Sequence, residues 1–196
     1  MAKKARVWTG TEFVELASAQ TDLTAYSTTA QVSSTYSPIS TTGLVLITSQ
    51  TIGTSVTSVT VNNAFSATYD NYLVTIAGGA ATGNINLNMV LGSTTTGYYF
   101  NASGAVWATS AANNVVGNNA SNFAYVGTGR TTGLNMSATI NSPFLAVNTT
   151  ISNPFIANDA SYSFNGILAN TTSYTAFTLA GGTLTGGTIR VYGYKN

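Results

Sequence analysis

From Leu44 onward the sequence alternates between short runs of β-favouring residues and clusters of turn residues, and this pattern restricts the possible folds more than any other feature. The runs are rich in valine, isoleucine, threonine, tyrosine and phenylalanine, and they recur roughly every 8–12 residues, a spacing typical of β-sandwiches and barrels. No convincing long helix separates them. We therefore predict an all-β fold, an antiparallel β-sandwich resembling a jelly roll, over residues 44–196.

The predicted strands combine imperfect period-two alternation with short apolar runs. They span residues 44–51, 55–61, 72–77, 85–91, 97–100, 105–109, 123–126, 134–140, 144–150, 162–168, 174–179 and 188–194. Paired glycines at 78–79, 181–182 and 186–187 predict turns, as does the glycine-rich segment 127–133, and the Asn/Gly-rich segment 113–122 predicts a loop. Pro143 and Pro154 lack the N–H that a ladder needs, so each is expected to open a strand or to lie at an edge or corner. The sequence leaves open whether either X–Pro bond is cis.

The first 43 residues differ in composition from the rest and are predicted to form a separate segment. More than half of the charged residues fall here, namely Lys3, Lys4, Arg6, Glu12, Glu15 and Asp22, and a Ser/Thr-rich stretch follows over 26–42. Apolar residues on both sides of Gly10 predict a small hairpin with that glycine in its turn. A lone hairpin is marginal in water, so Trp8 and Phe13 are expected to need a partner surface. Residues 22–36 fit either a short helix, with Leu23 and Tyr26 near one face, or a loosely ordered linker.

The near-absence of ionisable side chains restricts the chemistry available to this chain. It has 6 Lys and Arg, 5 Asp and Glu, no histidine and no cysteine in 196 residues. General acid–base catalysis, nucleophile activation and metal binding draw mainly on those residue types. We therefore predict a protein that is not an enzyme and has no catalytic, metal-binding or cofactor-binding residues. Asp70 and Asp159 could form the carboxylate pair of a glycosidase, but both lie in Asx-rich segments where turn formation is the better interpretation.

The charge balance also bears on the partners. A formal net charge of +1 gives no field to steer the chain towards nucleic acid or anionic membranes, and it suits a subunit whose normal state is an assembly. No apolar run approaches the roughly 20 residues that span a bilayer. Residues 1–6 resemble the start of a signal peptide, but no apolar region follows them, so secretion by that route is not expected. The lack of cysteine fits synthesis in a reducing cytoplasm.

Aromatic residues are the remaining candidates for a binding surface. Tyr98, Tyr99 and Trp107 flank a Gly/Ser/Asn segment, and Tyr125 follows the predicted loop at 113–122. Exposed tyrosine and tryptophan beside asparagine and threonine would suit stacking on sugars or docking of a protein partner. The alternative is that alternate members of these runs belong to the core of the sandwich.

Several segments resemble structural proteins of tailed bacteriophages. Residues 6–16 followed by 22–26 are similar to the N-terminal region of tail-fibre-like and other virion proteins, and residues 58–72 and 187–196 resemble the β-rich C-terminal domain of such proteins. The resemblance implies a homotrimeric or otherwise multimeric virion component, assembled in the host cytoplasm, and it brings no catalytic residues. Residues 1–43 would anchor the chain to other virion proteins, with docking residues Trp8, Phe13, Leu16, Leu23 and Tyr26. The sandwich would face outward, where it could contact a host-surface glycan or protein.

Two other functions stay open at this point. The same sandwich could be a capsid decoration protein that stabilises the phage head and recognises no host. It could also be a carbohydrate-binding module unrelated to virions, which would act as a monomer that binds glycan in solution.

Overall fold

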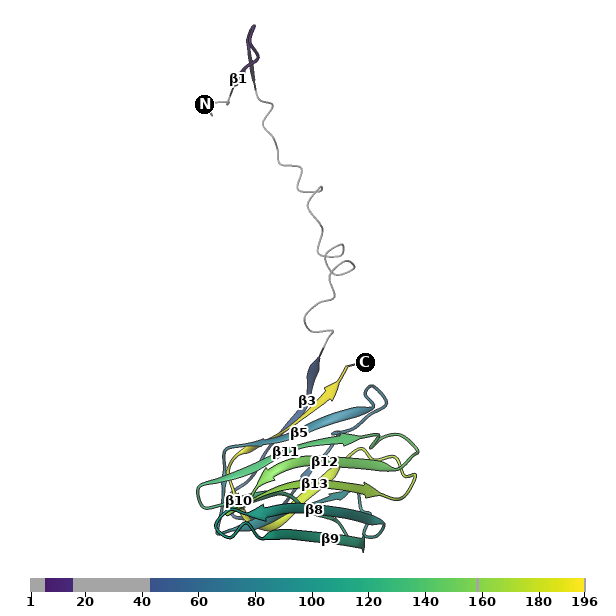
Figure 1. The fold of residues 1–196 in the computed structure, drawn as a ribbon. Coiled ribbons are helices and arrows are strands. Elements are labelled where there is room, and N and C mark those ends of the chain that lie inside the picture. Colours follow the sequence, from purple (N-terminus) through teal and green to yellow (C-terminus); the bar gives the residue numbers. More distant parts are fainter. Residues whose placement is uncertain (1–5, 16–42, 158, 196) are drawn as a thin grey trace. The chain divides into compact units, whose positions relative to one another are not determined.

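A computed structural model describes residues 6–15, 43–157 and 159–195, and all regular structure in these ranges is β-strand (Figure 1). The predicted all-β class and antiparallel sandwich are therefore confirmed. The described residues belong to two units, a small one N-terminal to Gly43 and a large one from Gly43 onward, which we call the body. Among the residues described, none forms a helix of the length and apolar character that crossing a membrane requires.

The described part of the small unit, residues 6–15, is a two-stranded hairpin. Strand β1 (Arg6–Trp8) pairs antiparallel with β2 (Phe13–Glu15), and Trp8 lies opposite Phe13 in the register. The turn is closed by a hydrogen bond from the Thr9 backbone N–H to the Glu12 carbonyl at 2.9 Å. Gly10 has a φ of 98°, a backbone conformation that glycine adopts without strain. The hairpin predicted around Gly10 is confirmed.

The body contains a large sheet, here called the first sheet. Its strand order is β3 (Leu44–Thr51), β15 (Thr188–Tyr194), β5 (Asn71–Ala77), β11 (Gly133–Asn141), β12 (Thr149–Ile156), β13 (Ala160–Leu168), β8 (Tyr98–Val106) and β9 (Ala112–Ala120). Every neighbouring pair is antiparallel. Strand β3 lies at one edge of this sheet and β9 at the other (Figure 1).

The second sheet of the body is smaller. Its order is β4 (Val56–Val61), β14 (Phe177–Thr185), β7 (Ile85–Leu91) and β10 (Phe123–Arg130), with the short β6 (Ala80–Ala81) also paired to β14. Strand β11 belongs to both sheets, because its start pairs with β10 and its remainder pairs with β5 and β12. Strands β3, β4, β5 and β7 alternate between the two sheets along the chain, as do β10, β11, β14 and β15.

The core lies where the inner faces of the two sheets meet, and strand alternation decides which residues fill it. On β5, Tyr72, Val74 and Ile76 are buried while their neighbours are less so. An aromatic cluster fills the part of the core beneath β8 and β13. The Tyr98 ring meets Phe123 edge-on with centroids 4.8 Å apart, and Phe100 and Phe123 pack against Phe164.

Several predicted strands match the structure. The ranges 44–51, 85–91 and 188–194 are reproduced residue for residue by β3, β7 and β15. Both proline peptide bonds are trans, since the described residues contain no cis bond. Pro143 lies in the loop after β11. Pro154 lies inside β12 and pairs with Ser163 of β13. The pairing of β12 with β11 ends at Ser152, so the missing N–H of Pro154 interrupts no ladder between β12 and β11.

Other boundaries were wrong, and glycine is the common reason. The predicted gap between 97–100 and 105–109 does not exist, because β8 runs through Gly104, where a side chain would collide with the Ser161 carbonyl. The predicted loop at 113–122 is largely strand β9, in which Gly117 lies against the ring of Phe100. In each case the glycine allows a close approach between strands, and it does not form a turn.

The same reason explains the errors at β10 and β14. The predicted turn at 127–133 is mostly strand, because Gly127 and Gly129 continue β10 against the side chains of Leu87 and Leu134. Strand β14 continues through the glycine pair 181–182, at an irregularity in its pairing with β4. The range 144–150 was also wrong, since β12 begins only at Thr149.

Candidate functional site

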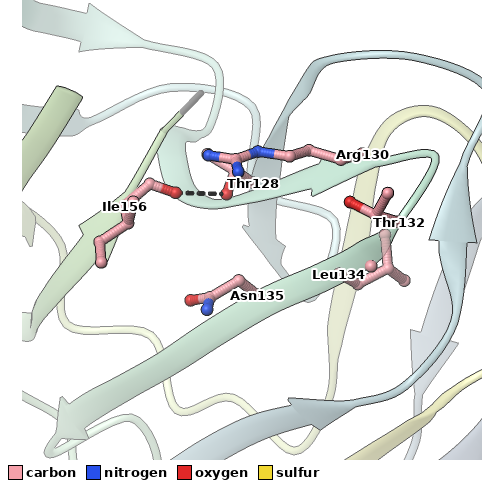
Figure 2. A pocket seen from close by; sticks show the side chains of 7 residues that line it. Thr128, Arg130, Thr132, Leu134, Asn135 and Ile156 are labelled. Atoms are coloured by element: carbon pink, nitrogen blue, oxygen red, sulfur yellow. Dashed lines mark hydrogen bonds between the residues drawn. The ribbon is translucent and has the colours of Figure 1, made fainter. Parts of the chain in front are cut away.

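A groove opens in the body at the junction of β10, β11 and β12. Residues Gly133–Asn135 of β11 pair with β10, whereas Thr139–Asn141 pair with β12, so β10 and β12 separate from β11 at different points. Figure 2 shows the residues that line the resulting space, which come from the paired strands β10 and β11, with Ile156 at the end of β12 on one side. We call this space the junction groove.

Three side-chain hydrogen bonds tie the end of β12 to β10. The Asn153 amide donates to the Val126 carbonyl at 2.6 Å, and the Thr128 hydroxyl donates to the Ile156 carbonyl at 2.9 Å. The Arg130 guanidinium donates to the Ala157 carbonyl. Because these bonds replace the missing ladder between the two strands, the walls of the junction groove are fixed.

A row of polar side chains lines the groove on the second sheet. Asn86 of β7, Thr128 of β10 and Asn135 of β11 are neighbours in the register of three adjacent strands. They lie on the outer face, because the alternate residues Leu87 and Leu134 are buried in the core. The row therefore places two amides and a hydroxyl side by side beside the Arg130 side chain.

The groove consists of three adjoining hollows. The central one has a volume of about 250 Å³ and is lined by Thr128, Arg130, Thr132, Gly133, Leu134, Asn135 and Ile156. A second, of about 170 Å³, shares Thr128 and Arg130 with it and adds Asn84, Ile85, Asn86, Gly129, Ala157 and Asp159. A third, of about 310 Å³, shares Asn135 and Ile156 and adds Pro154, Phe155, Ser161 and Tyr162. The hollows thus run from a charged end to an aromatic end.

The prediction of Tyr98 as a surface-binding residue was wrong. Its side chain is fully buried, and its hydroxyl accepts a hydrogen bond from the Leu91 N–H at 2.9 Å and donates to the Thr94 carbonyl at 3.2 Å. Burial raises the pKa of the Tyr98 hydroxyl to about 12; the Leu91 N–H lowers it, and Tyr174 adds a smaller upward contribution. Tyr98 belongs to the aromatic core because its position on β8 points inward.

The other three aromatic candidates do not gather at one place. Tyr99 and Trp107 are exposed, at 39% and 57% of their surfaces. They lie at opposite ends of β8. The rise per residue of a β-strand places them about 25 Å apart. Tyr125 is half-buried, packs against the core and has a φ of 64°. The structure therefore provides no single aromatic surface made of these residues.

The docking residues predicted for the N-terminal segment are only partly described. Trp8 is 54% exposed, and Phe13 is its cross-strand neighbour in the hairpin. Leu16, Leu23 and Tyr26 lie outside the described residues, as does the helix or linker predicted over 22–36.

The two carboxylates of the body are too far apart to act together. Asp70 precedes β5, whose Asn71 pairs with Asn141, which in turn pairs with Thr150 at the start of β12. Asp159 lies beyond the other end of β12. The rise per residue of a β-strand places it about 20 Å from Asp70. A glycosidase pair requires roughly 5 to 9.5 Å. Within residues 6–15, 43–157 and 159–195, no three acidic, histidine or cysteine side chains gather as metal ligands would.

The junction groove was not predicted from the sequence. Its central residues Thr128 and Arg130 fall in the segment interpreted as a turn, and Asn135 was assigned only to a strand. The one available signal was the scarcity of charge, which makes Arg130 and Asp159 conspicuous. Comparison with models of known protein families, with curated proteins and with solved structures finds no match for this chain.

Proposed function

We propose that this protein is a non-enzymatic structural component of a tailed-bacteriophage virion, an appendage attached through residues 1–43 with its sandwich facing outward. The observation that carries the proposal is the division of the chain into a hairpin with an exposed tryptophan and a separate, larger body. This division matches the anchor and outward domain implied by the resemblance of residues 6–16, 58–72 and 187–196 to tail-fibre-like proteins.

The hairpin has the properties of a docking element. An isolated two-stranded hairpin is marginally stable at best in water, so it gains stability by packing on a partner. Trp8 exposes 54% of its surface, and exposed tryptophan is enriched among the residues that dominate binding energy. Virion proteins that receive the hairpin are the proposed partners.

The body supports the proposal through its strand order. The order β3-β15-β5-β11 in one sheet and β4-β14-β7-β10 in the other interleaves the strands as in a jelly roll, with β8, β9, β12 and β13 extending the first sheet. Jelly rolls are common in viral capsid and lectin domains, although a fold by itself does not fix a function. We further propose that the chain forms a homo-oligomer in the virion, with a trimer favoured by the resemblance.

The edges of the sheets are consistent with a subunit of an assembly. Soluble proteins commonly protect edge strands with charged residues or proline. Strands β3, β4 and β9 lie at sheet edges and contain neither, and Leu44 and Leu46 of β3 are exposed at 47% and 53%. Such edges would be covered when copies of the chain pack together.

Complementation in trans of a phage that lacks this gene tests the proposal. Particles should carry the full-length chain and the Thr11→Ala variant, which changes an exposed turn residue of the same hairpin. The Trp8→Ala variant and a chain lacking residues 1–43 should be missing from particles while staying folded and soluble. Recovery of the truncated chain on particles would contradict the anchoring role.

Quantification of the particle-bound protein separates the two virion functions. A few dozen copies or fewer per particle would support an appendage, whereas hundreds would support a head decoration protein. Mass measurement of the purified chain tests the oligomer, and a monomer at all concentrations would contradict the proposed trimer.

A further inference from the structure

We propose that the junction groove between β10, β11 and β12 is a binding site for a neutral saccharide. The biological setting of this inference rests on the proposed function, because an outward-facing domain is the part that would meet a host-surface glycan. The binding itself depends only on the groove, so it can be tested with the purified protein.

The shape of the groove suits an extended ligand of a few sugar rings. Its three hollows adjoin, since neighbouring hollows share Thr128 and Arg130 on one side and Asn135 and Ile156 on the other. Ligand sites commonly occupy roughly 300–1,000 Å³, and only the hollow of about 310 Å³ reaches the lower limit of this range by itself. A ligand that follows all three must therefore be elongated.

The polar groups in the groove are planar and largely unengaged. The hydrogen bond to Ala157 uses one of the five N–H donors of Arg130. Asn86 and Asn135 contribute amides that make no side-chain hydrogen bond within the described part of the chain, and Asp159 contributes an exposed carboxylate. Guanidinium, amide and carboxylate groups each present two parallel polar positions, which match pairs of adjacent hydroxyls on a sugar ring.

The charge in the groove favours a neutral ligand. Arg130 and Asp159 line the same hollow, yet no ion pair joins them in the described ranges. An anionic ligand would gain from Arg130 and be repelled by Asp159, and a cationic ligand would meet the reverse. A polyhydroxylated neutral ligand can accept hydrogen bonds from Arg130 and donate them to Asp159, so it uses both groups.

The other end of the groove offers an aromatic surface. Tyr162 stacks on Phe155 with centroids 5.0 Å apart and planes within 9°. The Tyr162 hydroxyl accepts a hydrogen bond from the Asn113 amide at 2.7 Å, which fixes the ring. Phe155 is 3% exposed and belongs to the core, so only the partly buried Tyr162 ring can meet the apolar C–H face of a sugar, whose hydroxyls remain available to Asn135.

The site is also held in place before any ligand arrives. Thr128 and Arg130 lie on β10 and are bonded to the carbonyls of Ile156 and Ala157 at the end of β12. Side chains on strands with fixed rotamers lose little freedom on binding, which favours affinity. Figure 2 shows the Arg130 side chain extending along β10 towards the end of β12, above Asn135 on β11.

Binding of the full chain to an array of neutral and acidic oligosaccharides tests this inference, followed by titration calorimetry with the neutral oligosaccharide that binds best. Asn135→Ala and Asp159→Ala should each weaken that binding about tenfold or more, because each removes a pair of hydrogen bonds to the ligand. Asn165→Ala is the matched control, since it removes an exposed strand asparagine outside the groove, and it should leave the affinity unchanged. The melting temperatures of all variants should stay close to that of the parent chain.

Three results would overturn the inference: no neutral oligosaccharide bound at millimolar concentration, binding of acidic oligosaccharides alone, or binding that the groove variants leave intact. If the groove variants bind normally and Asn165→Ala loses oligosaccharide binding, the saccharide site would lie on the first sheet instead. Failure here is distinguishable from failure of the proposed function. A chain that binds no glycan but still depends on Trp8 for entry into particles would keep its virion role and lose the saccharide site.

Discussion

Replacing Tyr98 by phenylalanine removes one oxygen atom from the middle of the core. That oxygen accepts the Leu91 N–H at 2.9 Å and donates to the Thr94 carbonyl at 3.2 Å, and the tyrosine is fully buried. Phenylalanine keeps the ring and its edge-on contact with Phe123. The substitution therefore isolates the hydroxyl as the only group lost.

The expected cost is about 1–3 kcal/mol of unfolding free energy, because a buried donor loses its acceptor without gaining water. For a domain of this size, each 1 kcal/mol lowers the melting temperature by about 2–4 °C. We therefore expect Tyr98→Phe to melt about 2–12 °C below the parent chain at neutral pH.

The raised pKa of the Tyr98 hydroxyl also predicts that the stability of the fold decreases at alkaline pH. The folded pKa of Tyr98 is raised from 10.0 to about 12, so between these values the folded state holds a proton that the unfolded state releases. This raised pKa contributes at most about 3 kcal/mol to the free energy of unfolding. The contribution is fully present below pH 10 and is lost as the pH rises towards 12. The Tyr98→Phe variant should lack this part of the alkaline loss.

Urea denaturation at pH 7 and at several values between pH 9.5 and 12 measures both effects. Tyr99→Phe is the control, because Tyr99 is the adjacent residue on the opposite face and is 39% exposed. It should change stability by no more than about 0.5 kcal/mol. A Tyr98→Phe variant as stable as this control at pH 7, with the same alkaline dependence as the parent, would refute the reasoning.

Two further predictions concern packing and organisation. Gly117→Ala should destabilise the body by about 1–3 kcal/mol in urea titrations, because its new methyl group would meet the ring of Phe100, which is itself packed on Phe164. Gly133→Ala has open space around the new methyl group and should stay within about 0.5 kcal/mol; equal losses in both variants would contradict the packing argument. Residues 43–196 expressed alone should melt within about 3 °C of the full chain by calorimetry, and a larger drop would show that the N-terminal segment contributes to the stability of the body.

The sequence predicts the class of this fold because alternation is a local property. Strands β7 and β15 show clear runs of apolar residues bounded by turn residues, and their limits follow from the sequence. Strand β9 lacks such a run, because asparagine and glycine dominate it. Asn113 is placed there by a hydrogen bond to Tyr162, 49 positions away in the chain. No local pattern carries that information.

Register explains the outcome for the aromatic candidates. Alternation requires Tyr98 and Tyr99 to point to opposite faces of β8, but it does not say which face meets the other sheet. The pairing of β8 with β13 decides this and sends Tyr98 inward.

The junction groove depends on longer-range pairing still. It exists because β11 changes partners from β10 to β12 partway along its length. The residues on its walls come from β7, β10, β11, β12, β13 and the β12–β13 connection, so no contiguous motif marks it.

The pairing of β3 with β15 determines how the body would respond to mechanical force. Leu44 lies opposite Tyr194 and Thr51 opposite Thr188, so β3 is held along its whole length by a single antiparallel neighbour. Consider a force applied to Gly43 along the axis of β3 while the rest of the body is held. It would shear the hydrogen bonds between β3 and β15 at the same time, instead of breaking them one by one. In the proposed virion role, a force that reaches the body through Gly43 would therefore be shared by many hydrogen bonds in parallel.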